Sequence, residues 1–471
     1  MPEDALRRAA AGGEWRDRVV VAALLWINGI VLLNALLHSP FVGYDALDHL
    51  RYIDVLAGGR LPGEADTTEF FAAPLPYVVP ALLQAFATDR WGVVVKAAQL
   101  QNVAWSIGLT LMLVRLCRLI GPGDRTLVRW ALGLLAVAPV YYKTFAFVRG
   151  EPLAAFLSVV VVERALSLAA AGRSRVRGWA ALGLCIGLLL LAKQWGAFVV
   201  VAVFAFLAWH AVSESRRRAE RLSGIAVAVL VSTLACGWYY LSLHQRFGSA
   251  VTFNSPAADG WSLSNRPAAF YTDLGLAKVF VDPVREAFAV GAGVALLPVF
   301  YADFWGDYWC YWAVHAHDPA GGWASGAVLM DVVRANPAAG NLDTIAPYLG
   351  RVNAVALLPT AVVLAGAWLG LVQLAKMLTA GRATGDAPGL GLAAAVLTVT
   401  AGGYFYLLVG YPALDVKAGY LLHIVPFAAV LGAAALSRVA TTRPLLHRRL
   451  GLALLLAGLH NAPLFFTRYV W

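Results

Sequence analysis

The residues best suited to acid–base chemistry lie in the segment 43–53, which reads GYDALDHLRYI. Drawn as a helix from residue 44, its 3.6-residue period gathers four polar side chains on one face: Asp45, Asp48, His49 and Tyr52. A carboxylate near a low-dielectric boundary can be tuned as a proton acceptor, so this face is a candidate acid–base surface. A structural role fits as well, with Asp45 capping the helix N-terminus and Asp48 in its first turn. The local pattern leaves both interpretations open.

Three basic residues stand at the ends of apolar stretches. Arg149 and Glu151 share a short polar turn, so they pair with each other or Arg149 binds an anionic head group. Lys193 ends an apolar run and either snorkels to water or serves as a point charge for a phosphate. Lys417 stands with Asp415 where a later apolar run begins. A phosphate contact is therefore one of two interpretations for Arg149 and for Lys193.

An aromatic cluster at 300–312, FYADFWGDYWCYW, contains two acids, Asp303 and Asp307. A belt at the membrane interface accounts for the Tyr and Trp residues but not for the acids. Aromatic rings also stack on sugar faces while acids hold sugar hydroxyls, which is the functional interpretation. Three further residues offer ligands for a divalent metal: His315, His317 and Asp318. Their spacing is weak evidence, so we expect no required cofactor.

The elements that must position these residues are membrane helices. Hydrophobic residues make up 60% of the 471-residue chain and charged residues only 14%, which excludes an ordinary soluble protein. We therefore predict one all-α, polytopic membrane domain over 1–471, because about 20 apolar residues cross a bilayer as a helix. About eleven stretches approach that length: 19–37, 92–114, 127–142, 152–171, 178–192, 196–212, 222–243, 352–375, 390–410, 418–437 and 450–467. No signal-peptide cleavage pattern appears, so we expect the first helix to be retained.

The net charge of +10 does not indicate nucleic-acid binding, because the basic residues alternate by loop. Of the 37 Lys and Arg residues, 22 fall before the first span or in every second loop, and the positive-inside rule makes that side cytoplasmic. The N-terminus is then cytoplasmic, in a protein of the plasma membrane. The two longest polar segments, 38–91 and 244–351, are extracytoplasmic. All the candidate residues above belong to that face.

Taken together, these features resemble the GT-C superfamily of membrane glycosyltransferases, which includes protein O-mannosyltransferases and lipid A aminoarabinose transferases. The resemblance covers most of the chain. Its motifs are Tyr44-Asp45 after the first span, LAGGRLP at 56–62 and AAPLPY at 72–77, with RGEP at 149–152, AKQW at 192–195 and DVKAGY at 415–420. Relatives often have His-Pro-Pro or Lys-Pro-Pro where this chain has Ala72-Ala-Pro, so that basic residue is absent here.

The resemblance implies an inverting transfer of a sugar from a polyprenyl-phosphate carrier to an acceptor hydroxyl on the extracytoplasmic face. It implies that Asp45 is the catalytic base, with three candidates for a second acid: Asp48, Glu69 and Glu151. The growing charge on the departing phosphate would be offset by three cations: Arg149, Lys193 and Lys417. Sugar and acceptor contacts would come from His49, Tyr52, Asp303, Asp307 and Tyr420.

Two functions of other classes also fit an outer face with acids and cations. One is a transporter or flippase of a lipid-linked glycan, and the other is a non-catalytic partner of a complex that builds the cell envelope. Against a transporter, no charged residue lies near the middle of a clear span, and no inverted repeat of broken helices is visible. The sequence favours the glycosyltransferase.

Overall fold

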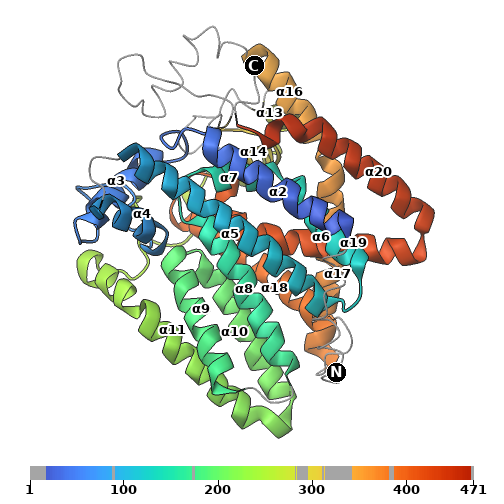
Figure 1. Cartoon of the computed structure of the whole chain (residues 1–471), viewed down its shortest axis with the longest axis horizontal. Helices are drawn as coiled ribbons and strands as arrows, with labels where there is room; N and C mark the ends of the chain where they lie inside the picture. Colours follow the sequence, from blue (N-terminus) through green and yellow to red (C-terminus); the bar gives the residue numbers. More distant parts are fainter. Residues whose placement is uncertain are drawn as a thin grey trace.

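The computed structural model describes residues 17–86, 91–171, 175–281, 283, 295–309, 312, 342–380 and 387–467. These residues form helices and no strand, which confirms the predicted all-α fold (Figure 1). The first half of the chain contains α2 (Arg18–Leu37), α3 (Ala46–Ala57), α4 (Leu75–Phe86), α5 (Trp91–Ile120), α6 (Arg125–Ala136), α7 (Pro139–Ala146), α8 (Glu151–Ala170), α9 (Val176–Ala192), α10 (Gly196–Ser213) and α11 (Arg218–Phe247). The second half contains α13 (Leu276–Phe280), α14 (Leu296–Trp305), α16 (Leu342–Val355), α17 (Leu357–Ala380), α18 (Ala387–Gly410), the 3₁₀ helix η4 (Ala418–Ile424), α19 (Val425–Thr442) and α20 (Pro444–Asn461).

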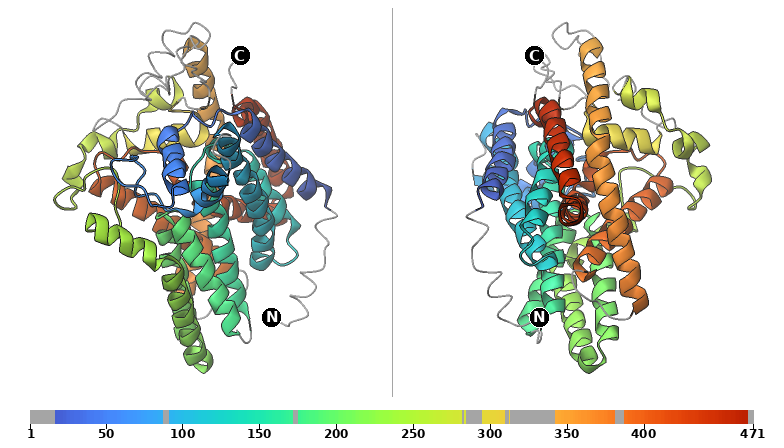
Figure 2. Two further views of the ribbon diagram at one scale, coloured as in Figure 1. Left: turned by 60° about the vertical axis from the view of Figure 1, so that its left-hand side comes forward. Right: turned by 90° about the vertical axis from the view of Figure 1, so that its right-hand side faces the viewer.

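Eight helices of the described residues are long and apolar enough to cross a membrane. They lie in α2, α5, α8, α10, α11, the α16–α17 pair, α18 and the η4–α19 pair. The predicted count of about eleven spans is therefore not confirmed in number. Figure 2 shows α16 and α17 as a long orange column along one side of the molecule. The protein is an integral membrane protein by the length and composition of these helices.

Three of the predicted spans are not among these eight helices, and each has a reason in its own sequence. The stretch 127–142 is split into α6 and α7, because Pro139 opens α7 and cannot continue the hydrogen-bond ladder of α6. Helix α9 has 17 residues, which is short for a span. Helix α20 has the right length, but Arg448 and Arg449 lie within it.

Helices pack side by side both with near neighbours in the sequence and with distant helices, as α6 does with α19. Helix α9 packs on α11 and α8, α5 packs on α8, and α17 packs on both α18 and α19. Figure 1 shows α8 to α11 together on one side of the molecule and α17, α19 and α20 on the other. Small residues permit close approach: a Cβ at Gly183 of α9 would collide with the backbone of Ala228 in α11. Membrane helices commonly associate through such small residues.

The segments that carry the candidate residues converge on η4. Helix η4 contacts α7, α8, α14, α18 and α19, while α3 packs against α4, and α4 packs against α5 and α9. Helix α4 has only 12 residues with Pro80 inside it, so it is too short to cross the bilayer. The helical bundle therefore frames one polar region built from the segment 38–74, the turn 147–150 and the start of η4.

Candidate active site

Asp45 occupies a strained position at the start of α3. The helix begins at Ala46, and Asp45 precedes it with φ 54° and ψ 27°, in the left-handed region. Among the described residues it is the single non-glycine residue with a positive φ. Its side chain makes no capping hydrogen bond, so the capping interpretation is wrong. Strain of about 1–3 kcal/mol at one residue is typical of functional sites.

The Asp45 carboxylate instead faces Lys417, which comes from the segment before η4. Lys417 Nζ lies 3.2 Å from Asp45 Oδ2 and 3.7 Å from Asp415 Oδ2. Burial alone raises the pKa of Asp45, but the charges of Lys417 and Arg149 hold that pKa below its ordinary value. Asp45 is therefore an anion at neutral pH and is free to accept a proton.

A second charge cluster joins the turn 147–150 to the end of α9. Arg149 binds Glu151 through two parallel hydrogen bonds, Nε to Oε2 at 2.7 Å and Nη2 to Oε1 at 2.8 Å. Lys193 Nζ lies 3.0 Å from the same Glu151 Oε1. All three side chains are buried, and Arg149 Nη1 has no hydrogen-bond partner among the described residues. One carboxylate thus serves two cations, so the cluster can accept a further anion.

The close approach that forms this cluster depends on Gly150. A Cβ at this position would lie 2.5 Å from the carbonyl oxygen of Ala192, at the end of α9. Only glycine lets the turn that carries Arg149 lie directly against the helix end that carries Lys193. The sequence pattern RGEP therefore has a steric reason as well as a chemical one.

Two tyrosine rings lie between the cations of the two clusters. The ring centroid of Tyr44 is 5.5 Å from Arg149 Cζ and 5.2 Å from Lys417 Nζ. The ring centroid of Tyr420 is 5.6 Å from Arg149 Cζ, 5.6 Å from Lys417 Nζ and 5.8 Å from Lys193 Nζ. The faces of aromatic rings attract cations. The two rings therefore help to keep three like charges close together.

A cavity of about 100 Å³ opens between these side chains. It is lined by charged and aromatic residues from distant parts of the chain: Asp45, Glu69, Phe71, Lys193, Trp195, Phe253, Asp415, Lys417 and Tyr420. Three carboxyl groups and two ammonium groups thus share one small volume, with aromatic walls. That combination can deprotonate a hydroxyl while holding an anionic group nearby.

Of the three candidates for a second acid, Glu69 is the one that lines this cavity. Burial raises the pKa of Glu69 to about 7, so the carboxyl exchanges its proton near neutral pH. Asp48 is used inside its own segment, where its Oδ1 accepts from Thr67 Oγ1 at 3.2 Å. Glu151 is committed to Arg149 and Lys193.

The other residues predicted to contact sugar or acceptor lie behind the cavity, with the exception of Tyr420. His49 is buried, its Nδ1 lies 2.8 Å from Tyr77 Oη, and burial lowers its pKa to about 3, which keeps the ring neutral. Tyr52 donates to the carbonyl of Ala72 at 2.8 Å. His49 Nδ1 and Tyr52 Oη are thus engaged within the protein, whereas His49 Nε2 has no hydrogen-bond partner among the described residues. Neither residue lines the cavity.

Asp303 and Asp307 are fully buried as well. Asp307 accepts from the backbone N–H of Trp312 at 3.1 Å. Asp303 forms an ion pair with Lys143, 2.6 Å from Nζ to Oδ1. Sequence reasoning did not single out Lys143, and its one signal was a lysine directly after the apolar stretch 127–142. Both acids are internal to the protein, and neither lines the cavity.

A larger apolar groove of about 650 Å³ adjoins the cavity, and the two share Trp195 and Phe253. Residues of α9, α10, α11, α18 and the segment 249–261 line the groove, among them Leu190, Phe198, Tyr240, Trp261 and Leu407. Helices α10, α11 and α18 are candidate spans, so this groove lies within the bilayer-facing part of the molecule. An elongated apolar group fits there, with its polar end at the cavity.

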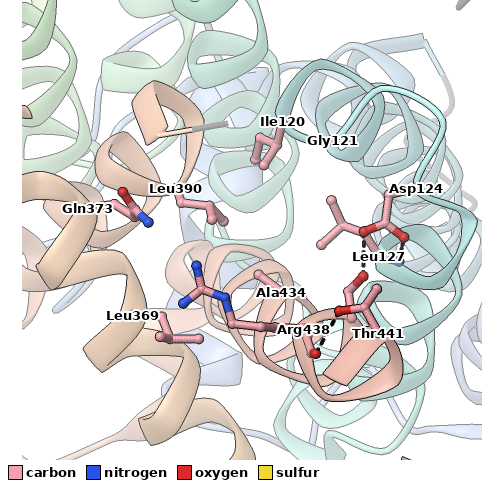
Figure 3. A pocket seen from close by; sticks show the side chains of 11 residues that line it. Ile120, Gly121, Asp124, Leu127, Leu369, Gln373, Leu390, Ala434, Arg438 and Thr441 are labelled. Carbon is pink, nitrogen blue, oxygen red and sulfur yellow. Dashed lines mark hydrogen bonds between the residues drawn. The ribbon is translucent and has the colours of Figure 1, made fainter. Parts of the chain in front are cut away.

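A third pocket, of about 390 Å³, lies about 20 Å along α19 from the end of η4. Figure 3 shows Arg438 and Gln373 on one side of this pocket and Asp124 on the other. Asp124 accepts from the Leu127 N–H at 2.9 Å and from Ser437, so its carboxylate caps α6. With its acid engaged in this way, the pocket lacks a free base.

The cavity does not have the ligand set of a metal site. The described residues contain no group of three or more His, Cys, Asp or Glu side chains that could hold a metal ion. The acids around the cavity are matched by lysine and arginine instead. His315, His317 and Asp318 lie outside the described residues. We therefore assign no step to a metal.

No protein-family model and no curated protein matches the sequence. The fold does match solved structures. Archaeal oligosaccharyltransferase AglB from Archaeoglobus fulgidus, in complex with an inhibitory peptide and a dolichol-phosphate, aligns with a TM-score of 0.53 and 14% identity, over 96% of this chain and 56% of that chain. The A. fulgidus oligosaccharyltransferase tethered with an acceptor peptide aligns with a TM-score of 0.53 and 15% identity, over 97% and 56%. The chain thus spans a little over half the length of these enzymes.

ArnT from Cupriavidus metallidurans, bound to undecaprenyl phosphate, aligns with a TM-score of 0.35 and 15% identity, over 91% of this chain and 79% of that chain. That TM-score is too low to carry an argument. The match to the oligosaccharyltransferase shows the fold, and it confirms the GT-C fold that the sequence motifs predicted.

Proposed function

We propose that this protein is a membrane glycosyltransferase that moves a sugar from a polyprenyl-phosphate carrier to an acceptor hydroxyl. One observation carries the proposal: the strained Asp45 carboxylate shares a cavity with Lys193 and Lys417, and this cavity continues into a large apolar groove. A base, a phosphate site and a lipid-tail site are the three parts that such a transfer needs. The GT-C fold supports the same reaction class, as does the dolichol-phosphate that AglB binds.

In the proposed reaction the acceptor hydroxyl attacks the anomeric carbon of the donor sugar. Its proton passes to Asp45, and the bond between the anomeric carbon and the phosphate oxygen breaks, with the electron pair leaving on the phosphate. Attack opposite the leaving group inverts the anomeric configuration. Lys193, Lys417 and the unpaired Nη1 of Arg149 offset the charge that grows on the phosphate.

Lys417 links the base to the phosphate site. In the free protein its ammonium group holds the pKa of Asp45 low, which makes Asp45 a weak base. A donor phosphate that draws the same ammonium group toward itself weakens this restraint, so the pKa of Asp45 rises when the donor is bound. The base would then be strongest in the complex that needs it.

We assign the cavity to the extracytoplasmic face. The basic loops support this orientation, because Arg443 follows the 18-residue helix α19, whose other end adjoins the cavity through η4. Eighteen residues rise about 27 Å, close to the thickness of the hydrocarbon core. The arginine-rich end and the cavity are therefore about one bilayer apart, with the N-terminus on the arginine-rich side.

A reconstitution experiment tests this function. Purified protein in liposomes would be given polyprenyl-phosphate-linked sugars and a panel of hydroxyl acceptors, while mass spectrometry identifies any co-purified lipid. We expect a co-purified polyprenyl phosphate and donor-dependent transfer that Asp45→Asn abolishes. If the protein moves a lipid-linked glycan across the membrane and forms no new glycosidic bond, it is a flippase and the proposed function is wrong.

A further inference from the structure

Asp303 is tied to both residues that flank the ion pair between Asp45 and Lys417. Its Oδ1 accepts a hydrogen bond from Tyr44 Oη at 2.7 Å, and its Oδ2 accepts one from the backbone N–H of Ala418 at 2.6 Å. Tyr44 directly precedes Asp45, and Ala418 directly follows Lys417. One carboxylate therefore joins the two chain segments that supply the ion pair.

Lys143 allows this carboxylate to stay in the protein interior. Its Nζ lies 2.6 Å from Asp303 Oδ1 and 2.9 Å from the Asp303 carbonyl oxygen, and the two side chains are 1% and 0% exposed. A buried ion pair of this kind adds little net stability, but removing one partner leaves an uncompensated charge. The pair therefore serves geometry more than stability, because it fixes Asp303 against α7.

The Tyr44 ring links Asp303 to two cations, Lys417 and Arg149. The ring lies 5.2 Å from Lys417 Nζ and 5.5 Å from Arg149 Cζ, measured from its centroid. Because the hydroxyl at the far end of this ring is held by Asp303, the ring cannot swing without breaking that bond. Asp303 thus holds both the Tyr44 ring, which lies against Lys417, and the backbone of Ala418, which follows Lys417.

We propose that Asp303 is a positioning residue that sets the distance between the Asp45 carboxylate and the Lys417 ammonium group. Its kinetic consequence rests on the proposed function, whereas its effect on Lys417 does not. Loss of Asp303 loosens the ion pair, so the pKa of Asp45 rises and that of Lys417 falls. Among the described residues, the charged and titratable groups around Asp45 are Lys417, Arg149, His49, Glu69 and Tyr420, together with Lys193 and Asp415, which line the same cavity.

The first test needs no substrate. The purified protein is acylated with a small amine-reactive ester at pH 8, and mass spectrometry measures the rate at each lysine, with Lys278 as an internal reference. We expect Asp303→Asn to raise the acylation rate of Lys417 about fivefold or more, because a smaller pKa shift leaves more free amine. Tyr44→Phe removes one hydrogen bond and keeps the Lys143 pair, so it should give a smaller rise.

Asp307→Asn is the matched control, because Asp307 is equally buried in the same segment and its carboxylate accepts from the backbone N–H of Trp312. It should leave the Lys417 acylation rate unchanged. Wild-type rates in both Asp303→Asn and Tyr44→Phe would overturn the proposal. The Tyr44→Phe variant, which retains every buried charge, decides the question should Asp303→Asn fail to fold.

The second test follows transfer activity against pH. In Asp303→Asn the acid limb of kcat/KM should move to higher pH and kcat should fall about tenfold or more, since a misplacement of about 1 Å costs up to 10²-fold. A merely structural role would lower the amount of folded protein without moving the limb. If the wild type transfers no sugar but Lys417 acylation responds as expected, the proposed function fails and the positioning role stands. An unmoved limb in an active Asp303→Asn variant contradicts that role.

Discussion

Asp45 can be tested cleanly because asparagine tolerates the left-handed backbone region and has nearly the shape of aspartate. Asp45→Asn should therefore leave folding and lipid binding intact while removing the proton acceptor. We expect transfer to fall by about 10²–10⁴-fold. The measurement is turnover in liposomes at saturating donor, together with thermal unfolding in detergent.

Asp48→Asn is the control for that change. Asp48 lies one helical turn further along α3, and its carboxylate holds Thr67 rather than a cavity group. This variant should lose some stability and keep its turnover. Normal turnover in Asp45→Asn would remove Asp45 as the base, whatever the control does.

The raised pKa of Glu69 leads to a prediction about the folding stability of the protein, which can be tested without a substrate. Its pKa, about 7 in the folded protein, lies above the ordinary glutamate value because the carboxyl is buried. The folded state then binds a proton that the unfolded state has released, so stability is full below about pH 4.5 and is lost as the pH rises toward 7. Glu69→Gln carries no such proton. The melting temperature of Glu69→Gln, relative to that of the wild type, should therefore rise between pH 5 and pH 8. A difference that does not change with pH would contradict the raised pKa.

At the residue scale the sequence identified most of the charged groups but not their partners. Arg149, Glu151, Lys193 and Lys417 stood out by type and by their place at helix ends. The structure brings the three cations around one pair of tyrosine rings, and Glu151 binds two of them. The pairing of Arg149 with Glu151 was one of the two interpretations that the sequence left open, and the structure shows it. The contacts of Lys193 with Glu151 and of Lys417 with Asp45 were beyond the sequence, because they join separate segments of the chain. The positive φ of Asp45 could not be predicted either. The periodicity of the segment suits a helix that starts at residue 44, whereas α3 begins at Ala46.

At the scale of elements, the approach of the turn 147–150 to α9 depends on one glycine. Gly150→Ala places a methyl group 2.5 Å from the Ala192 carbonyl oxygen, so the two segments must separate. Overpacking of this kind costs about 1–3 kcal/mol, and it should also part Arg149 from Lys193. We expect a lower melting temperature and a larger loss in turnover than in the amount of folded protein.

Gly29→Ala in α2 is the matched control, because a Cβ there meets nothing within 4 Å. This change should be neutral or slightly stabilising, since alanine favours helix over glycine by about 1 kcal/mol. Equal effects of the two substitutions would show that the turn adapts to a side chain at position 150.

The sequence predicted the helix boundaries correctly where apolar runs were long. The prediction was wrong where a proline or charged residues interrupted the run. The spans in α2, α8, α10 and α18 lie close to their predicted ranges. The predicted span at 127–142 became two helices because Pro139 ends the ladder, although hydropathy alone does not register a proline. The cavity itself could not be predicted, because its walls come from elements whose relative positions hydropathy does not fix.

At the scale of the whole molecule, composition and charge pattern were enough to predict an all-α membrane protein. The match to the fold of the oligosaccharyltransferase supports that fold class. Composition and charge pattern also predict which side each loop occupies, and this remains a prediction. It matters for the mechanism because a polyprenyl-phosphate sugar must reach the cavity from the leaflet on which the cavity opens.

Cysteine labelling in intact cells tests this orientation. Ser249→Cys lies beside the apolar groove in the segment after α11, and Thr442→Cys lies at the end of α19 before the basic residues of α20; both positions are exposed. The native Cys117 and Cys236 are buried, whereas Cys185 is partly exposed and Cys310 lies outside the described residues, so Cys185 and Cys310 are first replaced by serine. A membrane-impermeant maleimide should label Ser249→Cys in intact cells and should label Thr442→Cys only after the cells are permeabilised. The reverse pattern would place the cavity on the cytoplasmic side, where a donor presented from the outer leaflet could not reach Asp45.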